Sequence, residues 1–368
     1  MSTSDSNVVG AAPSEGKVVC SYNEWDPLEE VIVGVVDGAA VPEWHVTLKA
    51  TMPDDQRAFY AEYGGKPFPK ETIAAAHEDL EGFVRLLEKE GVRVRRPDVV
   101  DHARPFQTPD WRSACGLYAA MPRDLLLVVG DEIIEAPMPW RSRYYEMHCY
   151  RRLLKEYFKA GARWTSVPKP ELRDEIYDYD FVDPVPGGPM RYVVTEFEPV
   201  FDAADFTRCG KDIFYQLSNV TNRFGAEWLQ RHLGDAYRLR QLDVADTHPM
   251  HIDATFVPLC PGKVLVNPER PPQLMPLFKD WQIIEAPRPS VPDHIVMHMS
   301  SRWISMNIVM IDEKRVVVEE NEKELAALFK KNGFEPIPCR FNNFNRFGGS
   351  FHCATLDVRR RGTLQSYF

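Results

Sequence analysis

Residues 307–337 read NIVMIDEKRVVVEENEKELAALFKKNGFEPI, and they show the unit from which most of the chain is built. The unit comprises, in order, a strand at 307–311, a turn at 312–314, a strand at 315–318, a helix at 322–331 and an extended run at 334–337. Leu325, Leu328 and Phe329 recur at the spacing that places them on one face of a helix, and Gly333 supplies the helix stop. These residues therefore predict a strand–strand–helix–strand unit.

Four other segments repeat this pattern. Their strands and helices are expected at 31–36, 73–87 and 92–94; at 125–129, 132–134, 145–159 and 164–167; at about 200, 213–217, 226–233 and 237–242; and at 251–257, 264–266, 274–280 and 282–285. The copies are spaced too irregularly for a solenoid, which needs a fixed period. A doubly wound parallel sheet, the rival architecture, would need a helix after nearly every strand, whereas hairpins intervene here. We therefore predict an α/β fold of five units that close around an axis, a five-bladed propeller.

The chain of 368 residues is expected to form one domain over residues 19–368. The proline-rich stretches at 184–189 and 287–292 are interpreted as surface loops, so no linker divides the chain. Residues 1–18 are expected to be a flexible tail. The first of them are small and polar, with neither the basic start of a signal peptide nor an arginine-rich amphipathic pattern.

Charge and cysteine content limit the partners. The sequence has 44 Lys and Arg against 54 Asp and Glu, a formal net charge of −10. That balance argues against a nucleic acid or an anionic membrane as partner, since both need a positive face, and it favours a small cationic substrate. Seven cysteines, an odd number without a CxxC pair, predict reduced thiols and a cytoplasmic protein. No apolar run approaches the ~18 residues that would span a bilayer.

Residues 247–255, THPMHIDAT, are the first candidate for chemistry. If this segment enters a strand, His251 and Asp253 point to the same face and line one pocket. The alternatives are a metal pair of His248 and His251, or a histidine that is merely hydrogen-bonded in the core. Pro249 argues against the metal pair, because it breaks the helix that would align an i, i+3 pair, and no third ligand lies nearby.

Residues 348–357, GGSFHCATLD, are the second candidate. The glycines before Cys353 would let the backbone approach a ligand closely. A strand from Phe351 would turn His352 and Cys353 to opposite faces, so the base for the thiol must come from elsewhere, and His251 is the candidate. The plain alternative is that Cys353 is an inert, small apolar residue.

Carboxylates form the third candidate group. Asp202 and Asp205 lie in the run 201–206, and Asp124 lies in 121–124, where each could equally be an ordinary loop or turn residue. The three arginines at 359–361 could suggest an anion site, but in a chain of net −10 they are interpreted as structural salt-bridge donors.

Taken together, these segments resemble the arginine:glycine amidinotransferase family over nearly the whole chain. The segments that carry the resemblance are 22–34, 121–124, 132–138, 201–206, 250–256 and 351–365. The resemblance implies a pentein-type five-bladed α/β propeller with one central active site. It also implies a homodimer and a reaction that needs neither a metal nor an organic cofactor.

By this resemblance the reaction moves the amidino group of L-arginine to an amine and leaves ornithine. It implies that Cys353 is the nucleophile, that His251 is the general acid and base, and that Asp202 orients His251. Further positions are implied to bind substrate: Asp124 and Asp253 the guanidinium, and Arg270, Ser300 and Ser301 the carboxylate end. A covalent amidino-cysteine between two half-reactions would give ping-pong kinetics.

The acceptor is expected to be glycine, with lysine or another small amine as the alternative. Met250 matches the glycine-using pattern, where its bulk narrows the pocket, whereas His248 stands where the glycine-using enzymes of animals carry Asn. Two other classes compete with transfer. One is a guanidine hydrolase resembling arginine deiminase, in which water attacks the covalent intermediate. The other is a catalytically silent propeller that serves as a binding scaffold.

Overall fold

The computed structural model describes residues 16–52, 56–185, 187–273, 276–292, 294–295, 299 and 301–368. Most of the tail expected at 1–18 therefore lies outside the described residues, as does Ser300. Gly16 is exposed, but Val19 and Cys20 are already buried, and Cys20 donates a backbone hydrogen bond to Val358. The described chain is therefore packed into the fold from Val19 onward.

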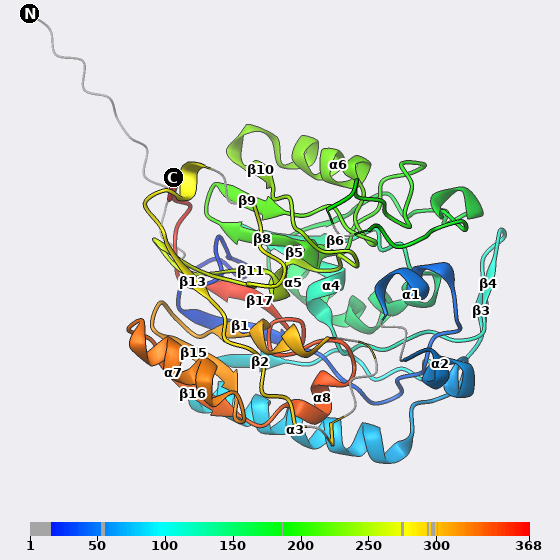
Figure 1. Cartoon of the computed structure of the whole chain (residues 1–368), viewed down its shortest axis with the longest axis horizontal. Helices are drawn as coiled ribbons and strands as arrows, with labels where there is room; N and C mark the ends of the chain where they lie inside the picture. The colour runs from blue at the N-terminus through cyan, green and yellow to red at the C-terminus, as the bar shows by residue number, and fades with distance from the viewer. Residues whose placement is uncertain are drawn as a thin grey trace, which may run out of the picture.

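Five three-stranded sheets carry the architecture, and all five are built alike (Figure 1). They are formed by β17 (Thr355–Arg360), β1 (Leu28–Val33) and β2 (Arg93–Arg95); β5 (Leu126–Val129), β6 (Glu132–Glu135) and β7 (Arg163–Ser166); β8 (Phe206–Cys209), β9 (Asp212–Tyr215) and β10 (Arg238–Gln241); β11 (Phe256–Cys260), β12 (Lys263–Val266) and β13 (Gln282–Glu285); and β14 (Val309–Met310), β15 (Arg315–Glu319) and β16 (Glu335–Cys339). In each sheet the middle strand pairs antiparallel with one neighbour and parallel with the other. The described residues contain no sheet that closes on itself.

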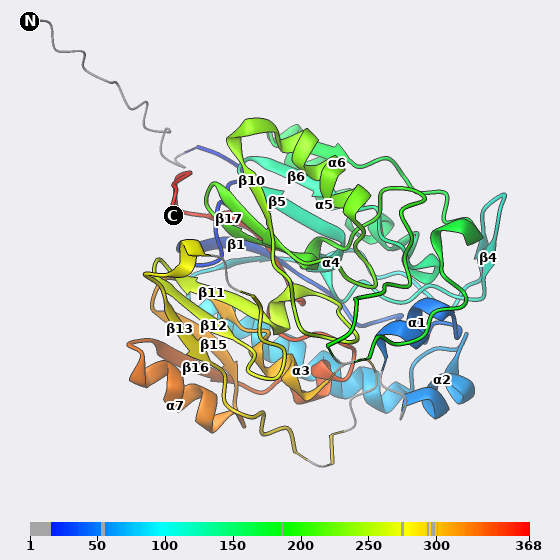
Figure 2. The ribbon, with the colours of Figure 1, turned by 45° about the horizontal axis from the view of Figure 1, so that its top comes forward.

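Helical connections make the parallel pairings possible, because a parallel neighbour needs a crossover. They are α3 (Lys70–Lys89), α5 (Arg151–Lys159), α6 (Arg223–Leu233), the short 3-10 turn η8 (Pro276–Phe278) and α7 (Lys323–Lys331). Figures 1 and 2 both show α3, α6 and α7 on the outside, with the strands between them. The amphipathic stripe predicted for α7 is confirmed at Leu325 and Phe329, which are buried.

Shorter elements fill the connections. They are the helices α1 (Val46–Thr51), α2 (Arg57–Tyr63), α4 (Pro122–Leu125) and α8 (Asn342–Asn345); the two-stranded hairpin of β3 (Phe106–Gln107) and β4 (Arg112–Ser113); and the 3-10 turns η2 (Arg141–Arg143), η3 (Glu146–Tyr150), η4 (Asp174–Ile176), η5 (Ala203–Asp205), η6 (Gly234–Ala236), η7 (Ile252–Ala254) and η9 (Arg302–Met306). Four of them, α4, η5, η7 and η9, come directly before the first strand of a sheet or nearly so, and these short turns carry much of the site.

Three local predictions are wrong. Residues 251–254 do not enter a strand, because His251 has a φ of 60° and η7 follows it; the strand begins at Phe256. Residues 351–354 form a turn, and β17 starts at Thr355. The strand expected near 200 begins at Phe206, after η5. In each case a tight turn separates the chemical motif from the strand, which alternation of residue types does not reveal.

The first unit is completed from the other end of the chain. Its antiparallel strand is β17, which pairs with β1 from Leu28↔Arg360 to Val33↔Thr355. The C-terminal strand therefore closes the unit that the N-terminal strand opens, and Cys353 lies just before that strand.

The hydrophobic core lies between the strands and the outer helices. On α3 the buried face includes Leu80, Phe83 and Leu87, and Phe83 packs edge-on against Phe351 and Phe341 at ring distances of 4.9 and 5.3 Å. This packing anchors the turn that carries Cys353. Among the described residues, no helix combines the length and apolar character that crossing a bilayer requires.

Candidate active site

Cys353 lies on a tight, buried turn that depends on glycine. Gly348 has a φ of 91°, in the left-handed region that favours glycine. A Cβ atom added to Gly349 would lie 2.7 Å from Cβ of Cys353 and 2.5 Å from Sδ of Met121. Only glycine allows this approach. The neighbours that require glycine here are Cys353 and Met121, whereas the expected close approach to a ligand stays a prediction.

The thiol of Cys353 contacts polar groups from distant parts of the chain. Asn307 Nδ2 donates a hydrogen bond to Sγ at 3.1 Å, and Sγ donates to Asp253 Oδ2 at 3.3 Å. The thiol, an imidazole nitrogen of His251 and a carboxylate oxygen of Asp124 all lie within 4.8 Å of one another. The structure therefore brings together the cysteine and the histidine that the sequence analysis paired.

His251 is held between two carboxylates. Its Nε2 lies 3.0 Å from Asp202 Oδ2, and its Nδ1 lies 3.7 Å from Asp124 Oδ1. Burial acts to lower the pKa of His251, but Asp124, Asp202 and the contact with Cys353 together raise it well above its usual range. Its positive φ costs roughly 1–3 kcal/mol, the kind of strain that functional sites store. The imidazole is thus positioned as a charged proton donor.

Burial makes the resting thiol a weak acid. It raises the pKa of Cys353 to about 12, and the nearby charge of Asp253 acts in the same direction, while His251 opposes them. The thiol is therefore protonated at neutral pH until the charge of the site changes. A cationic substrate would supply that change by neutralising the surrounding carboxylates.

Two buried carboxylate oxygens lack hydrogen-bond donors. Asp124 Oδ2 accepts from Arg143 Nη1 at 2.8 Å, but neither Asp124 Oδ1 nor Asp202 Oδ1 accepts a hydrogen bond from any residue that the structure describes. Arg143 in turn donates to Glu146 Oε2 at 2.9 Å. Buried polar atoms are nearly always paired. Because Asp124 lines the cavity and Asp202 does not, it is Asp124 Oδ1 that points to a ligand with N–H donors.

Asp253 is held from behind by His352. Oδ2 of Asp253 lies 2.7 Å from Nδ1 of His352, whose Nε2 lies 3.3 Å from Glu24 Oε2. Burial acts to lower the pKa of His352, but the two carboxylates raise it overall, and hydrogen bonding from His352 lowers the pKa of Asp253 against the opposing effect of its own burial. Asp253 is therefore kept ionised.

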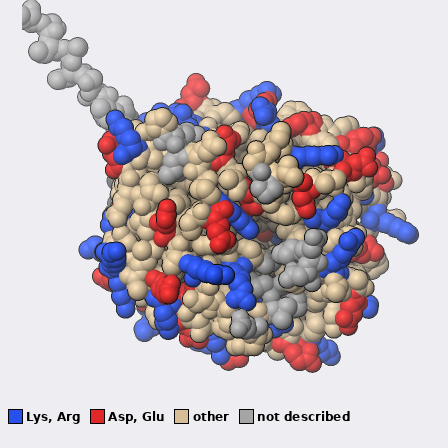
Figure 3. All heavy atoms as spheres, viewed as in Figure 1, with Lys and Arg blue, Asp and Glu red and all other residues tan. Residues whose placement is uncertain are grey.

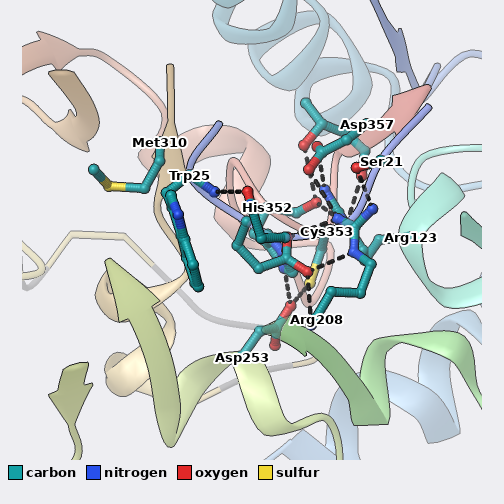
Figure 4. A network of polar contacts seen from close by, with 12 residues as sticks. Ser21, Trp25, Arg123, Arg208, Asp253, Met310, His352, Cys353 and Asp357 are labelled. Carbon is teal, nitrogen blue, oxygen red and sulfur yellow. Dashed lines mark hydrogen bonds and ion pairs between the residues drawn. The ribbon is translucent and has the colours of Figure 1, made fainter. Parts of the chain in front are cut away.

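A buried ionic network that includes Arg208, Arg123 and Asp357 lies next to His352 (Figure 4). Arg208 Nη2 donates to Glu24 Oε2 at 2.8 Å and to Asp357 Oδ2 at 2.9 Å, and Arg123 Nη2 donates to Asp357 Oδ1 at 2.7 Å. The sequence analysis missed Asn307, Glu24, His352 and Arg143 as site residues. His352 and Glu24 are 328 positions apart, and no local pattern could have joined them.

A cavity of about 280 Å³ opens beside the thiol of Cys353. Its lining includes Cys353, His251, Asp124, Asp253, Arg143, Met250, His248, Arg270, Ser301, Tyr118, Trp140, Met299 and Asp183. Arg270 pairs with Asp246 at 3.1 Å, and His248 pairs with Asp183 at 3.2 Å. All predicted substrate-contacting residues that the structure describes thus line one cavity, while Asp202 lies behind His251.

The metal-pair alternative is not favoured by this arrangement. His248 pairs with Asp183, whereas His251 pairs with Asp202, so the two rings have separate partners. Asp124, His251 and Cys353 are of metal-ligating types and lie close together, yet the guanidinium of Arg143 already neutralises Asp124 at 2.8 Å.

On the face seen in Figure 3, acidic and basic side chains are interspersed, without the continuous basic surface that nucleic acid would need.

Two curated relatives align with almost the whole chain. An L-arginine:L-lysine amidinotransferase of Pseudomonas savastanoi pv. phaseolicola is 56% identical over 349 residues, which cover 95% of this chain and 96% of that protein. A mitochondrial glycine amidinotransferase of Gallus gallus is 50% identical over 367 residues, which cover 97% of this chain and 86% of that protein. No protein-family model matches the chain.

Solved structures agree. SxtG, an amidinotransferase of Microseira wollei in the saxitoxin biosynthetic pathway, has a TM-score of 0.91 and 52% identity, over 95% of this chain and 99% of that one. A dimethylarginine dimethylaminohydrolase, at a TM-score of 0.56 and 14% identity over 89% of this chain and 99% of that one, shares the fold alone. These neighbours identify an α/β fold of pentein type.

The fold and the cavity, in which a thiol, an imidazole and several carboxylates meet, define an enzyme of the α/β pentein class. The chain belongs to the amidinotransferase family. It is a transferase, and the resemblance seen in its sequence motifs is confirmed.

Proposed function

We propose that this amidinotransferase takes the amidino group from L-arginine and passes it to an amine through a covalent amidino-cysteine on Cys353. The observation that carries the proposal is Asp124 Oδ1, a buried carboxylate oxygen beside the thiol that accepts no hydrogen bond from any described residue and has only a 3.7 Å ion pair with Nδ1 of His251. A guanidinium has N–H donors in a fixed plane that satisfy such an oxygen, and Asp253 offers a second carboxylate in the same cavity.

Binding by two carboxylates addresses the main chemical difficulty. A guanidinium carbon is a poor electrophile, because its charge is delocalised over three nitrogens. Holding its NH2 groups with Asp124 and Asp253 presents the carbon to Sγ and converts a bimolecular attack into one within the complex. The bound cation also lowers the pKa of Cys353 from its resting value, so substrate binding favours release of the thiol proton to solvent, while His251 keeps its own proton for the leaving nitrogen.

His251 then acts as the general acid for the leaving nitrogen and as the general base for the acceptor amine. The Cys353 thiolate attacks the guanidinium carbon and forms the S–C bond. As the C–N bond breaks, its electron pair goes to the leaving nitrogen, which takes a proton from His251, and ornithine departs. The neutral imidazole accepts a proton from the incoming acceptor amine, which attacks the amidino carbon and expels the thiolate. Donor and acceptor use the cavity in turn, and ping-pong kinetics follow.

Glycine is the acceptor proposed first. Met250 lines the cavity and reduces the space available to an acceptor, and the relative from Gallus gallus is a glycine amidinotransferase. Lysine is the second candidate, because the relative from Pseudomonas savastanoi pv. phaseolicola is named for lysine. His248 favours the second candidate, since it faces the cavity in a pair with Asp183 and differs from the Asn of the glycine-using pattern.

The larger arrangement is also part of the proposal. We propose that the five like-built sheets are the blades of a propeller around this cavity, as their common strand order supports. A homodimer and a cytoplasmic location are proposed with it. The location is supported by the seven cysteines, all of which are free thiols.

The test measures ornithine release from L-arginine in the presence of glycine, lysine or ethanolamine. We expect ornithine with an acceptor, glycine giving the highest kcat/KM, and one equivalent or less per site with arginine alone. Cys353→Ala should keep the fold and leave less than about a thousandth of the activity. Sustained citrulline formation from arginine alone would show that the enzyme is a hydrolase and not a transferase. An active Cys353→Ala protein would exclude the covalent intermediate on Cys353.

A further inference from the structure

Asn307 makes four contacts with the turn that carries the nucleophile. It is fully buried between η9 and β14. Its Oδ1 accepts hydrogen bonds from the backbone N–H groups of Ser350 and Cys353 at 3.1 and 3.0 Å, and its backbone oxygen accepts from the N–H of His352 at 3.3 Å. Nδ2 is the remaining polar group of this side chain, and it donates to Sγ of Cys353 at 3.1 Å.

The acceptor contacts determine the orientation of the amide. Because Oδ1 already binds two N–H groups, the amide cannot flip without placing its NH2 against those donors. Nδ2 is therefore directed at the sulfur in every state of the reaction. Asn307 differs in this respect from the other polar neighbours of the thiol. His251 can lose its charge, and the charges of Asp253 and Asp124 raise the pKa of Cys353.

Among the charged neighbours of Cys353, the two carboxylates favour the thiol and only His251 favours the thiolate. Asp253 and Asp124 both act to raise the pKa of Cys353, and His251 lowers it only while it carries its proton. Once His251 has protonated the leaving nitrogen, it no longer offers that charge. The amide of Asn307 is then the neutral donor that remains beside the sulfur.

We propose that Asn307 is a catalytic residue that stabilises the thiolate of Cys353 through Nδ2 and holds its turn in place through Oδ1. The inference rests on the proposed function, in which Cys353 attacks the amidino carbon. The hydrogen bond is strongest when sulfur is anionic, before the attack and again when the acceptor expels it. It weakens in the amidino-cysteine, where sulfur is bonded to carbon, so it favours loss of the thiol proton before the attack and departure of the thiolate when the acceptor attacks.

Asn307→Asp tests the donor while preserving the shape. The new carboxylate can still accept from Ser350 and Cys353, but it places an acceptor with negative charge beside the sulfur. The matched control is Asn222→Asp. Oδ1 of Asn222 likewise accepts two backbone N–H groups, from Val200 at 3.2 Å and Gly225 at 2.8 Å, and this residue is buried away from the cavity lining. A control with the same chemistry separates loss of the sulfur contact from a general loss of stability.

The readout is the second-order rate constant for alkylation of Cys353 by iodoacetamide between about pH 7 and 9, below the pKa of the thiol, followed by mass spectrometry of the peptide that contains it. For Asn307→Asp we expect this rate constant to fall about 10- to 100-fold at each pH, and kcat/KM for arginine to fall by a similar factor. Asn222→Asp should retain the wild-type alkylation profile. If Asn307→Asp does not fold, Asn307→Ala is measured in the same way, with the same expected fall.

An alkylation profile of a folded Asn307 variant that superimposes on the wild type would overturn the inference, whatever its turnover. This readout does not require turnover, so it is independent of the proposed function. Activity retained by Cys353→Ala would refute the nucleophile, whereas an unchanged alkylation profile would refute only the role of Asn307.

Discussion

Replacing Asp202 with Asn removes one charge from His251 with little change of shape. Asp202 Oδ2 lies 3.0 Å from Nε2 of His251. At an effective dielectric constant of about 20, two unit charges at that distance interact by about 5 kcal/mol, or at most about 4 pKa units. Asp124 remains 3.7 Å from the other ring nitrogen and retains part of the field. We therefore expect the pKa of His251 to fall by about 2 units.

The assay is the pH profile of kcat/KM for L-arginine. Protonated His251 is the proton donor, so activity declines as pH rises through its pKa, which the carboxylates raise in the wild type. In Asp202→Asn the alkaline decline should move to lower pH by about 2 units, and the maximum should fall about 100-fold or more.

Asp205→Asn is the control. Asp205 is buried nearby and interacts with His251 through charge alone, because its carboxylate accepts hydrogen bonds from Ser218 and Thr221 at 2.6 and 2.5 Å and not from His251. This variant should lose stability without a comparable shift of the alkaline decline. An Asp202→Asn profile that is reduced equally at every pH, with its alkaline decline unmoved, would refute the electrostatic role of Asp202.

Three further changes test the turn, the acceptor and the buried network. Gly349→Ala should lower kcat at least about 10-fold, because its Cβ would displace Cys353 at 2.7 Å; wild-type kcat would disprove the packing argument. His248→Asn should raise kcat/KM for glycine relative to lysine by about 10-fold, since it removes the pair with Asp183, and competition between the two acceptors measures this ratio. Glu24→Gln should cost about 3–5 kcal/mol of unfolding free energy at pH 7, measured with urea, because Arg208 loses a buried partner. Burial acts to raise the pKa of Glu24, but Arg208, His352 and Arg123 hold it well below its usual range. The stabilisation is therefore present above about pH 4.3 and lost as pH falls toward the folded-state value, where the two proteins should converge. A difference that does not depend on pH would contradict this assignment.

Local patterns were reliable where one segment decides its own structure. The strand predicted at 282–285 is β13 to the residue, and the helix predicted at 322–331 is α7 within one residue of its start. The helix α7 has its apolar residues at helical spacing and is followed by Gly333, and both signals are contained within a few neighbouring positions. The helix expected at 274–280 was predicted least well, because residues 276–278 form only the 3-10 turn η8.

Prediction from pattern failed where a turn interrupts the periodicity. His251 and Asp253 were expected to share a strand face, yet they reach the cavity from the residue before η7 and from η7 itself. The conclusion that both line one pocket agrees with the structure, although the geometric reason was wrong. The left-handed φ of His251 is unfavourable for an isolated residue, so only contacts with Asp202 and Asp124 from other units can maintain it.

The sequence by itself determined the five repeated units and, through long motifs, the family and its cysteine, because neighbouring residues and family resemblance are sufficient for both. Only the tertiary structure decided how the charges of the site are arranged. It brought Asn307 to the sulfur of Cys353 and connected Asp253 through His352 to Glu24, and it completed the first sheet with the C-terminal strand. Burial and the electrostatic field depend on residues up to 328 positions apart that lie together in one buried site, and no local pattern contains that information.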